Sequence, residues 1–241
     1  MLAQVPVLVL PQGRIQPALL NFLMNSLSRF TLTQAAEANF PTEYGLFRIY
    51  GFEGHFREED AAGGASETVE EAAVLAMGDP AGGGPGVQPP LLRIHSQCLT
   101  GDAFHSLRCD CRAQLEIAFR LISAEGRGIV IYELQEGRGI GLMNKLRAYA
   151  LQDRGADTVE ANQQLGFESD LRSYLLPGAI LRHLGIASVR LLSNNPGKVK
   201  AVEDAGVAVT ERIPCIAAPL ESTEAYLRTK REKMGHLFDH L

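Results

Sequence analysis

Residues 91–132 read LLRIHSQCLTGDAFHSLRCDCRAQLEIAFRLISAEGRGIVIY, and this stretch decides the fold. It predicts a strand to about Ser96, a helix from about Cys109 to Glu125 and a second strand at 128–132. The helix is indicated by Gly126 as its stop and by apolar residues at helical spacing, Leu115, Ala118, Phe119 and Ile122. A strand, a helix and a strand in this order are typical of an α/β protein with a layered sheet.

The alternation of strands and helices continues along the chain. Further strands are predicted at 45–52, 72–77, 188–193 and 207–212. Further helices are predicted at 140–153, near 170–184, at 196–204 and near 222–234. Two stretches rich in glycine or proline, 61–65 and 79–90, are predicted to be mobile surface loops. The pattern predicts an α/β fold with its site at the ends of strands.

The composition limits the class of protein. A hydrophobic fraction of 46% over 241 residues can supply a proper core. Four cysteines, no secretory leader pattern and no apolar run near the roughly 18 residues of a membrane span favour a cytoplasmic protein with no membrane partner. The net charge of −5 disfavours binding of nucleic acid, which requires a basic face. A small phosphorylated ligand needs only a local basic pocket.

Three cysteines, Cys98, Cys109 and Cys111, lie close together in the sequence, which favours a metal site. Cys109 and Cys111 are two residues apart and would point to different faces of a continuous helix, so we expect them at a helix start, where thiolates are stabilised. Three sulfur ligands leave a tetrahedral zinc one position short, as in catalytic sites. Two alternatives stay open: a structural zinc completed by His95 or His105, and buried thiols without metal. We expect Cys215 to be a core thiol.

Two turns between a strand and a helix have the composition of anion sites. Gln135-Glu-Gly-Arg-Gly-Ile-Gly141 can present free backbone N–H groups at a helix start, although an ordinary glycine-rich turn explains it equally well. Ser193-Asn-Asn-Pro-Gly-Lys198 places Asn195 at a helix cap and Pro196 at the first helical position. Lys198 then lies in the first turn, where the helix dipole disfavours a cation unless an anion is also bound; the alternative is a solvated lysine.

Five stretches together resemble GTP cyclohydrolase II: Arg93-Ile-His-Ser-Gln-Cys-Leu-Thr-Gly-Asp, Leu107-Arg-Cys-Asp-Cys, Gln135-Glu-Gly-Arg-Gly-Ile-Gly-Leu, Asn144-Lys-Leu-Arg-Ala-Tyr-Ala-Leu-Gln-Asp and Leu192-Ser-Asn-Asn-Pro-Gly-Lys. The similarity runs from about Ala35 to the closing Thr229-Lys-Arg-Glu-Lys-Met-Gly-His-Leu. It implies a three-layer α/β/α fold with a mixed sheet, in which residues 35–241 form the catalytic domain. Residues 1–34 are then an N-terminal extension, in which apolar side chains at helical spacing over 15–30 predict an amphipathic helix.

The resemblance implies a zinc-dependent homodimer whose substrate is GTP. Cys98, Cys109 and Cys111 would hold the catalytic zinc, and the enzyme would open the imidazole ring at C8, release formate, and remove pyrophosphate with magnesium. The product would be 2,5-diamino-6-(5-phosphoribosylamino)pyrimidin-4(3H)-one, the first intermediate of riboflavin synthesis. Zinc chemistry agrees, because a zinc-bound water can serve two successive hydrolyses. Three thiolates leave the centre at −1, and we expect Arg108 and Arg112 to offset part of that charge.

The resemblance also assigns residues. Its substrate contacts fall on Arg93, Ile94, His95, Ser96, Gln97, Gln114, Glu136, Gly137, Arg138, Thr158, Ser193 and Lys198. Among them, Arg93, Arg138 and Lys198 would hold the triphosphate. Gln114 and Glu136 would pair with the amide and amino edge of guanine.

The catalytic residues of the family fall on Asp170, Arg172 and Tyr149. From sequence alone, Asp170 and Arg172 fit a helix start with solvated charges, and Tyr149 fits a half-buried core position. The family assigns Arg172 to phosphoryl attack, but a guanidinium stays protonated over the working pH range, so we expect an electrostatic clamp on the α-phosphate. Tyr149 is expected to donate a proton to the leaving amine.

The chain departs from the family pattern at two positions, with Gln97 in place of a common glutamate and Leu134 in place of a common arginine. A zinc nucleobase deaminase is the nearest rival enzyme, but it requires His-x-Glu and Pro-Cys-x-x-Cys motifs, which this region lacks. A nucleotide sensor that keeps the zinc site without turnover is the rival from another class. Formation of product from GTP would separate an active enzyme from such a sensor.

Overall fold

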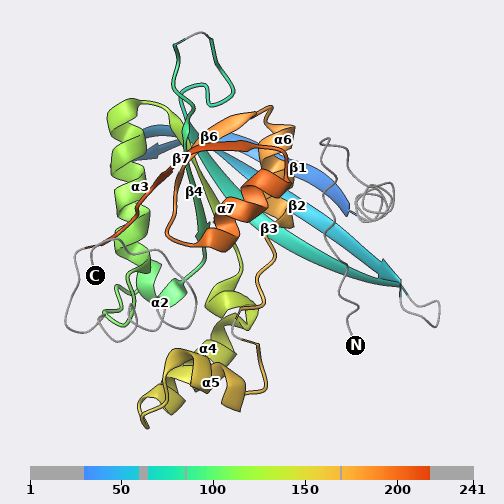
Figure 1. Cartoon of the computed structure of the whole chain (residues 1–241), viewed down its shortest axis with the longest axis vertical. Helices are drawn as coiled ribbons and strands as arrows, with labels where there is room; N and C mark the ends of the chain where they lie inside the picture. Colours follow the sequence, from blue (N-terminus) through green and yellow to red (C-terminus); the bar gives the residue numbers. More distant parts are fainter. Residues whose placement is uncertain (1–29, 60–64, 85, 169, 218–241) are drawn as a thin grey trace, which may run out of the picture.

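The computed structural model describes residues 30–59, 65–84, 86–168 and 170–217 (Figure 1). The helix expected at 15–30 lies outside these residues except for Phe30, which begins a strand. The helix expected near 222–234 and most of the loop at 61–65 also lie outside them. Among the helices described, none combines the length and the apolar character that a membrane span requires.

A mixed sheet of seven strands forms the middle layer of the described part, in the order β1-β2-β3-β5-β4-β6-β7. Strands β1 to β3 form an antiparallel meander, and β3 is also antiparallel to β5. The four strands β5, β4, β6 and β7 run parallel to one another. The strands are β1 (Phe30–Thr42), β2 (Gly45–Glu59), β3 (Ala65–Met77), β4 (Leu91–Ser96), β5 (Gly128–Glu133), β6 (Ser188–Leu192) and β7 (Ala208–Ile213).

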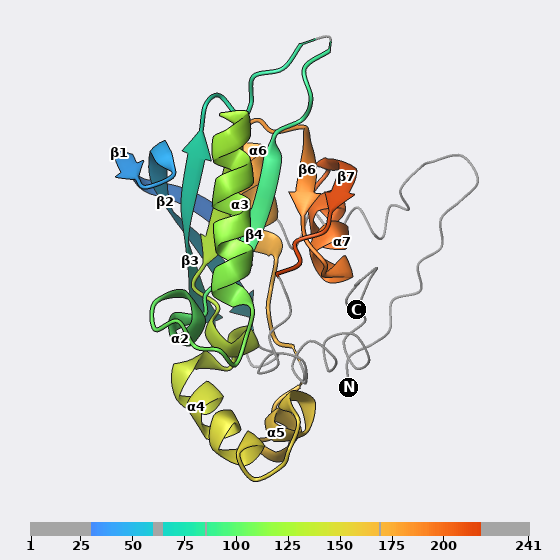
Figure 2. The ribbon, with the colours of Figure 1, turned by 90° about the vertical axis from the view of Figure 1, so that its left-hand side faces the viewer.

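Helices cover both faces of the sheet. Helix α3 (Cys111–Glu125) lies on one face, and α6 (Leu175–His183) and α7 (Pro196–Asp204) lie on the other (Figures 1 and 2). Helices α4 (Gly141–Gln152) and α5 (Thr158–Gln164) pack on each other beyond one end of the sheet (Figure 2). The short helices α2 (Leu99–Asp102) and η1 (Glu136–Gly139) follow β4 and β5. The predicted three-layer α/β/α fold with a mixed sheet is confirmed.

The alternating side chains of the central strands fill two cores. Ile129 and Ile131 of β5 face the core under α6 and α7, whereas Val130 faces the core under α3. This follows from the two-residue period of a strand, which sends successive side chains to opposite faces. Because both faces are covered, the strand reads as a continuous apolar run.

Most predicted elements from residue 91 onward are confirmed within a few residues. Sequence reasoning missed β1 because its side chains are mostly exposed and carry no clear alternation. It also missed α5, although Asp157 and Glu160 form the capping box that marks a helix start. The helix expected near 170 begins only at Leu175. The segment before it is bonded to the turn after β5, where Leu171 N donates to Arg138 O at 3.0 Å.

The order of the strands determines where a site can form. Parallel strands β4, β5 and β6 bring their carboxyl ends, at Ser96, Glu133 and Leu192, to one edge of the sheet. Each end is followed by a tight connection that opens a helix, namely α2, η1 or α7. Such an edge is where open α/β sheets bind ligands.

Helix α6 provides a test of the core. Replacement of Leu181, which is 0% exposed, by alanine should lower the free energy of unfolding by about 2–5 kcal/mol through lost burial and a residual cavity. Leu175→Ala in the same helix is the control; that side chain is 65% exposed, so its effect should stay within about 0.5 kcal/mol. Denaturant unfolding of both variants measures the difference, and equal losses would contradict this packing.

Candidate functional site

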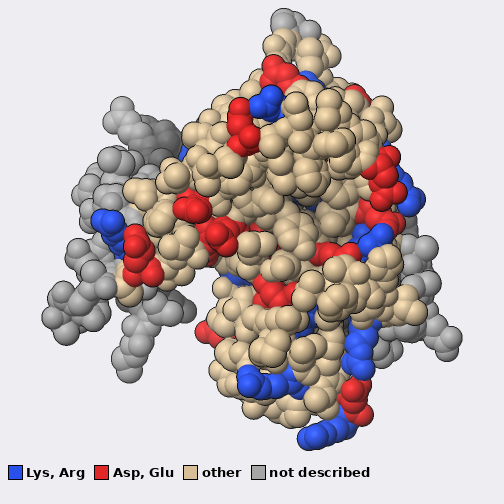
Figure 3. All heavy atoms as spheres, turned by 180° about the vertical axis from the view of Figure 1, so that it is seen from behind, with Lys and Arg blue, Asp and Glu red and all other residues tan. Residues whose placement is uncertain are grey.

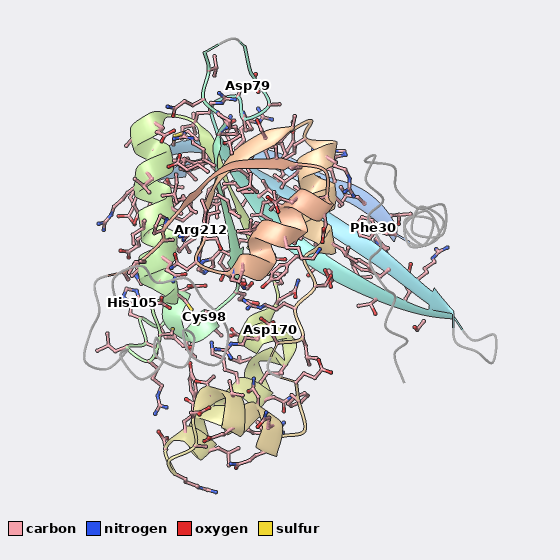
Figure 4. The ribbon with its side chains drawn as sticks, in the orientation of Figure 1. Phe30, Asp79, Cys98, His105, Asp170 and Arg212 are labelled. Carbon is pink, nitrogen blue, oxygen red and sulfur yellow. The ribbon has the colours of Figure 1, made fainter. Side chains whose placement is uncertain are left out.

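A cavity opens at the carboxyl edge of the sheet, between the sheet and the α4–α5 pair. The space between its walls, counted out to the open mouth, is about 1100 Å³. Figure 4 shows the labelled Cys98 and Asp170 near this end of the sheet, far from Asp79 at the opposite end. On the face seen in Figure 3, acidic and basic side chains are interspersed, so that face carries no uniform basic surface.

Most of the sequence-predicted site residues line this cavity. Those that do are Arg93, His95, Ser96, Gln97, Cys98, Cys109, Cys111, Gln114, Glu136, Gly137, Arg138, Tyr149, Thr158, Arg172, Ser193 and Lys198. The two exceptions are Ile94 and Asp170. Ile94 is buried in the core, but its carbonyl accepts a bond from Lys198 Nζ at 2.8 Å. Asp170 contacts the site through Arg172.

Three sulfur atoms meet at one end of the cavity. The Sγ atoms of Cys98, Cys109 and Cys111 lie within 4.8 Å of one another, and those of Cys98 and Cys109 are 3.6 Å apart. Cys111 is the first residue of α3, which confirms the expected helix start. Among the described residues no histidine joins this group; His95 instead lies 3.2 Å from Asp102. Cys215 is buried in the core, as expected.

Interactions among the three cysteines move their pKa values in opposite directions. Hydrogen bonds from Cys109 and Cys111 hold the pKa of Cys98 well below its usual range, and Lys145 lowers it further. The hydrogen bonds of Cys111 to Cys109 and Cys98, together with burial, raise its pKa above the usual value. Because metals bind the thiolate form of cysteine, a bound dication would favour ionisation of all three sulfurs.

The sulfur cluster has the dimensions of a zinc site. Tetrahedral ligands at a Zn–S distance of about 2.3 Å lie about 3.8 Å from one another. The separation of 3.6 Å between Cys98 and Cys109 is close to this value. The residues present thus fit a zinc ion with three thiolate ligands and a fourth position open to the cavity.

The cation beside the sulfurs is Lys145. Its Nζ lies 3.0 Å from Cys98 Sγ and 2.7 Å from Glu136 Oε1. Although burial lowers the pKa of Lys145, the hydrogen bond to Glu136 and the charge of Cys98 outweigh it and raise the pKa above its usual range. Arg108 and Arg112, which we expected in this role, instead pair with Asp153 and Glu116.

Tyr149 lines the cavity next to the sulfur end. Its hydroxyl lies 3.1 Å from Thr100 Oγ1, which in turn lies 3.7 Å from Cys98 Sγ. The Arg108 guanidinium stacks over the ring at 4.9 Å. Burial raises the pKa of the phenol, so it stays protonated at neutral pH. The side chain is half-buried, as expected, but it faces the cavity.

Arg138 occupies an unusual backbone conformation in the turn after β5. Gly137 and Arg138 have φ values of 64° and 65°, in the left-handed region that non-glycine residues seldom adopt. Both terminal nitrogens of the Arg138 guanidinium are buried and have no hydrogen-bond partner among the described residues. Buried charges are normally paired and hydrogen-bonded. The turn therefore places at the cavity a cation with hydrogen-bonding capacity to spare, which favours an anion site over an ordinary glycine-rich turn.

Lys198 and Arg172 add two more cations. Lys198 is 5% exposed, so the solvated alternative is wrong. Burial lowers its pKa, and the nearby charges of Arg172 and Arg93 lower it further. Arg172 forms a two-bond ion pair with Asp170, at 2.8 Å to Oδ1 and 2.5 Å to Oδ2. Burial raises the pKa of Asp170, but the bonds and charge of Arg172 outweigh it and hold that pKa below its usual range.

Gln114 and Glu136 are already engaged within the protein. Gln114 accepts a bond from Arg93 at 2.6 Å and donates to Asp110 at 2.5 Å. One oxygen of Glu136 accepts from Leu99 N at 2.7 Å, and the other accepts from Lys145. An amide and a carboxylate each have further hydrogen-bonding sites, so contact with a base edge would add to these bonds.

Sequence reasoning missed several lining residues, including Gln135, Lys145, Gln152 and Asn162. Lys145, Tyr149 and Gln152 share one face of α4, because four and then three residues separate them. That spacing could have identified Lys145 and Gln152 once Tyr149 was placed in the site. Asn162 comes from α5, which sequence reasoning did not identify; it is 3% exposed.

The two departures from the family pattern lie in different places. Gln97 lines the cavity next to Cys98. Leu134 is 47% exposed and lies outside the cavity wall. Only the first therefore changes the charge of the site.

Comparison with known proteins agrees with this site. Residues 33–214 match the family model described as GTP cyclohydrolase II. A protein named GTP cyclohydrolase-2 from Actinobacillus succinogenes is 49% identical over 87% of this chain and 89% of its own length. Proteins of the same name from Azotobacter vinelandii and Yersinia pseudotuberculosis are 50% and 51% identical, over 86% of this chain and 92% and 97% of their own lengths.

Gly101 tests the geometry of the sulfur cluster. A Cβ at this position would lie 2.9 Å from Cys109 Sγ and 3.1 Å from Cys98 Sγ, so Gly101→Ala should displace the sulfurs. We expect zinc affinity, measured by chelator competition, to fall by at least about tenfold while the protein stays folded. Gly51→Ala is the control, because nothing lies within 4 Å of a Cβ there. Unchanged zinc affinity in Gly101→Ala would refute the cluster.

Proposed function

We infer that this chain, an enzyme that belongs to the GTP cyclohydrolase II family, opens the imidazole ring of GTP at C8 and releases formate and pyrophosphate. The product would be 2,5-diamino-6-(5-phosphoribosylamino)pyrimidin-4(3H)-one, at the first step of riboflavin biosynthesis. One observation carries this proposal: a three-sulfur cluster and three buried or half-buried cations, Arg138, Arg172 and Lys198, line the same cavity. A metal site for hydrolysis and a site for a polyphosphate are thus combined.

Cys98, Cys109 and Cys111 would hold a zinc ion with one position open to the cavity. When bound there, zinc would supply the Lewis-acid chemistry that activates water for attack on carbon. Lys145 keeps a positive charge 3.0 Å from Cys98 Sγ and so limits the negative charge that three thiolates create. Glu136 holds both Lys145 and the backbone of Leu99, and thereby fixes the loop that carries Cys98.

The opposite part of the cavity would bind the triphosphate with its magnesium. Arg138 offers two buried nitrogens that have no partner in the described part of the chain, and a phosphate would satisfy both. Arg172, held by Asp170, would stabilise negative charge on the α-phosphate as pyrophosphate departs. Its ion pair with Asp170 keeps the guanidinium protonated, so we assign it no nucleophilic role.

Recognition of guanine would require a hydrogen-bonding edge in the cavity wall. Gln114 and Glu136 stay the residues proposed from the family pattern, but each holds other partners in this structure. Gln152 and Asn162 also line the cavity and offer amide donors and acceptors. A site of this kind discriminates strongly, because a base without the matching groups leaves buried polar atoms unpaired.

Tyr149 is proposed to supply the proton that the second hydrolysis needs. Expulsion of an amine from the formamide is slow unless its nitrogen is protonated. Burial keeps the phenol protonated, and Thr100 orients its hydroxyl toward the sulfur end of the cavity. We therefore assign to the phenol the role of proton donor to the leaving nitrogen.

Incubation of the zinc-loaded chain with GTP and magnesium tests the function, with products identified by mass and formate measured separately. We expect formate, pyrophosphate and the diaminopyrimidine in equal amounts. Cys109→Ser should abolish formate release, whereas Cys215→Ala, which removes a sulfur outside the cluster, should retain it. A folded, zinc-loaded chain that binds GTP but forms no product would support the sensor hypothesis.

Tyr149→Phe should bind zinc and GTP normally but lose about 10²-fold in turnover, since a positioned acid is removed. A formylated pyrimidine should accumulate if the second hydrolysis is most affected. Tyr44→Phe is the matched control: its ring stacks on Phe119, outside the cavity wall, and it should release formate at the parental rate. If Tyr149→Phe also kept that rate, the phenol would have only a packing role.

A further inference from the structure

We propose that Glu133 is a positioning residue of the phosphate site: a buried counter-ion that holds Ser96, Arg172 and Lys198 in place and takes up a proton when a polyphosphate binds. The proposal rests on the proposed function insofar as that function places the triphosphate at these cations. Glu133 is the last residue of β5 and is 1% exposed. It lies behind the cavity wall, so it acts on a ligand only through its neighbours.

Ser96 connects Glu133 to two cations. Its hydroxyl donates to Glu133 Oε2 at 3.3 Å and accepts from Arg172 Nη1 at 3.3 Å and from Lys198 Nζ at 3.4 Å. A serine hydroxyl has one proton and two lone pairs. Because the carboxylate takes the proton, both lone pairs face the cations. Glu133 therefore determines the orientation of Ser96 and, through it, the positions of Arg172 and Lys198.

Gln135 provides a second link from Glu133 to the same segment. Its Nε2 lies 3.2 Å from Glu133 Oε1 and 2.7 Å from the carbonyl of Ser173, and its Oε1 accepts from Ser173 N at 3.1 Å. Ser173 follows Arg172 directly. The carboxylate thus contacts the end of β4 directly and is linked through Gln135 to the segment that carries Arg172.

Charged groups from three elements act on Glu133. Lys198 from α7 and Arg172 from the segment before α6 favour its ionised form, and Glu70 from β3 opposes it. Burial is the largest influence and raises the pKa of Glu133 to about 7. At neutral pH the carboxyl is therefore close to half-ionised while the cations face an empty cavity.

Binding of a polyphosphate changes this balance. The added negative charge neutralises Arg172 and Lys198, which are the groups that favour the ionised carboxylate. Burial and Glu70 then dominate, so the carboxyl takes a proton from solvent and becomes neutral. Its second oxygen can still accept the Ser96 hydroxyl, and the positions of the cations are kept. The affinity for polyphosphate should thus fall as the pH rises above 7, because binding then requires proton uptake.

Calorimetric titration of the zinc-loaded full chain with the magnesium salt of inorganic tripolyphosphate tests the proposal. Two buffers that differ in ionisation enthalpy give the number of protons taken up. With a carboxyl pKa near 7 in the empty site, we expect uptake to rise from pH 6 to pH 8 and to reach about half a proton per chain at pH 7. The affinity should fall by about fivefold between pH 7 and pH 8.

Glu133→Gln keeps the shape and an oxygen acceptor for Ser96 but removes the titration, so both effects should vanish and the KM for GTP should lose the matching pH dependence. Glu71→Gln, on the neighbouring strand at an exposed position, is the control and should behave like the parent.

Equal proton uptake in the parent and Glu133→Gln would overturn the proposal. Proton uptake by the parent protein that does not increase from pH 6 to pH 8 would also overturn the proposal, and this measurement requires no variant. Tripolyphosphate binding is independent of turnover, so a chain that shows the uptake but leaves GTP intact would refute only the proposed function.

Discussion

The site depends on the parallel pairing of β4 with β5 and β6, which brings three strand ends to one edge of the sheet. Each strand is buried on both faces, so its register is fixed by the core and cannot slip without exposing apolar side chains. The same register therefore determines the positions of the residues that follow the strands. The cysteine loop after β4, the Arg138 turn after β5 and the cap of α7 after β6 therefore meet at this edge. Hydrogen bonds from Leu99 N to Glu136 Oε2 and from Lys198 Nζ to Ser96 Oγ join them there.

Charge is distributed unevenly along the cavity. At the sulfur end, Lys145 and Glu136 form an ion pair that serves Cys98 and leaves little net charge. Away from the sulfurs, two nitrogens of the Arg138 guanidinium have no hydrogen-bond partner in the described ranges, and Lys198 donates to Ile94 O and Ser96 Oγ, which carry no charge. Burying cations so close together costs stability in the empty protein. Glu133 offsets part of that cost without entering the cavity, which a carboxylate in the wall could not do without repelling a phosphate.

The sequence predicted most elements from Leu91 onward, though not α5, because their strands are apolar and their helices carry caps such as Asn195 and stops such as Gly126. It failed where exposure removes periodicity, as in β1. The cysteine cluster and the two turns between a strand and a helix were found because such patterns are rare, whereas Tyr149, Asp170 and Arg172 were assigned only through the resemblance to the family. Lys145 and Glu133 were not, since a lysine inside a helix and a glutamate at a strand end are ordinary in sequence. Only the packing shows that one lies beside a sulfur and the other behind two cations.

The same distribution of charge bears on the orientation in which we propose that a nucleotide binds. With its base toward the sulfurs, the phosphates would meet Arg138, Arg172 and Lys198, which line the same cavity. In the reverse orientation these cations would receive no counter-charge from the ligand, and a buried cation without a partner is costly. The cations therefore favour the orientation that brings the base to the metal site, whichever hydrogen bonds identify the base.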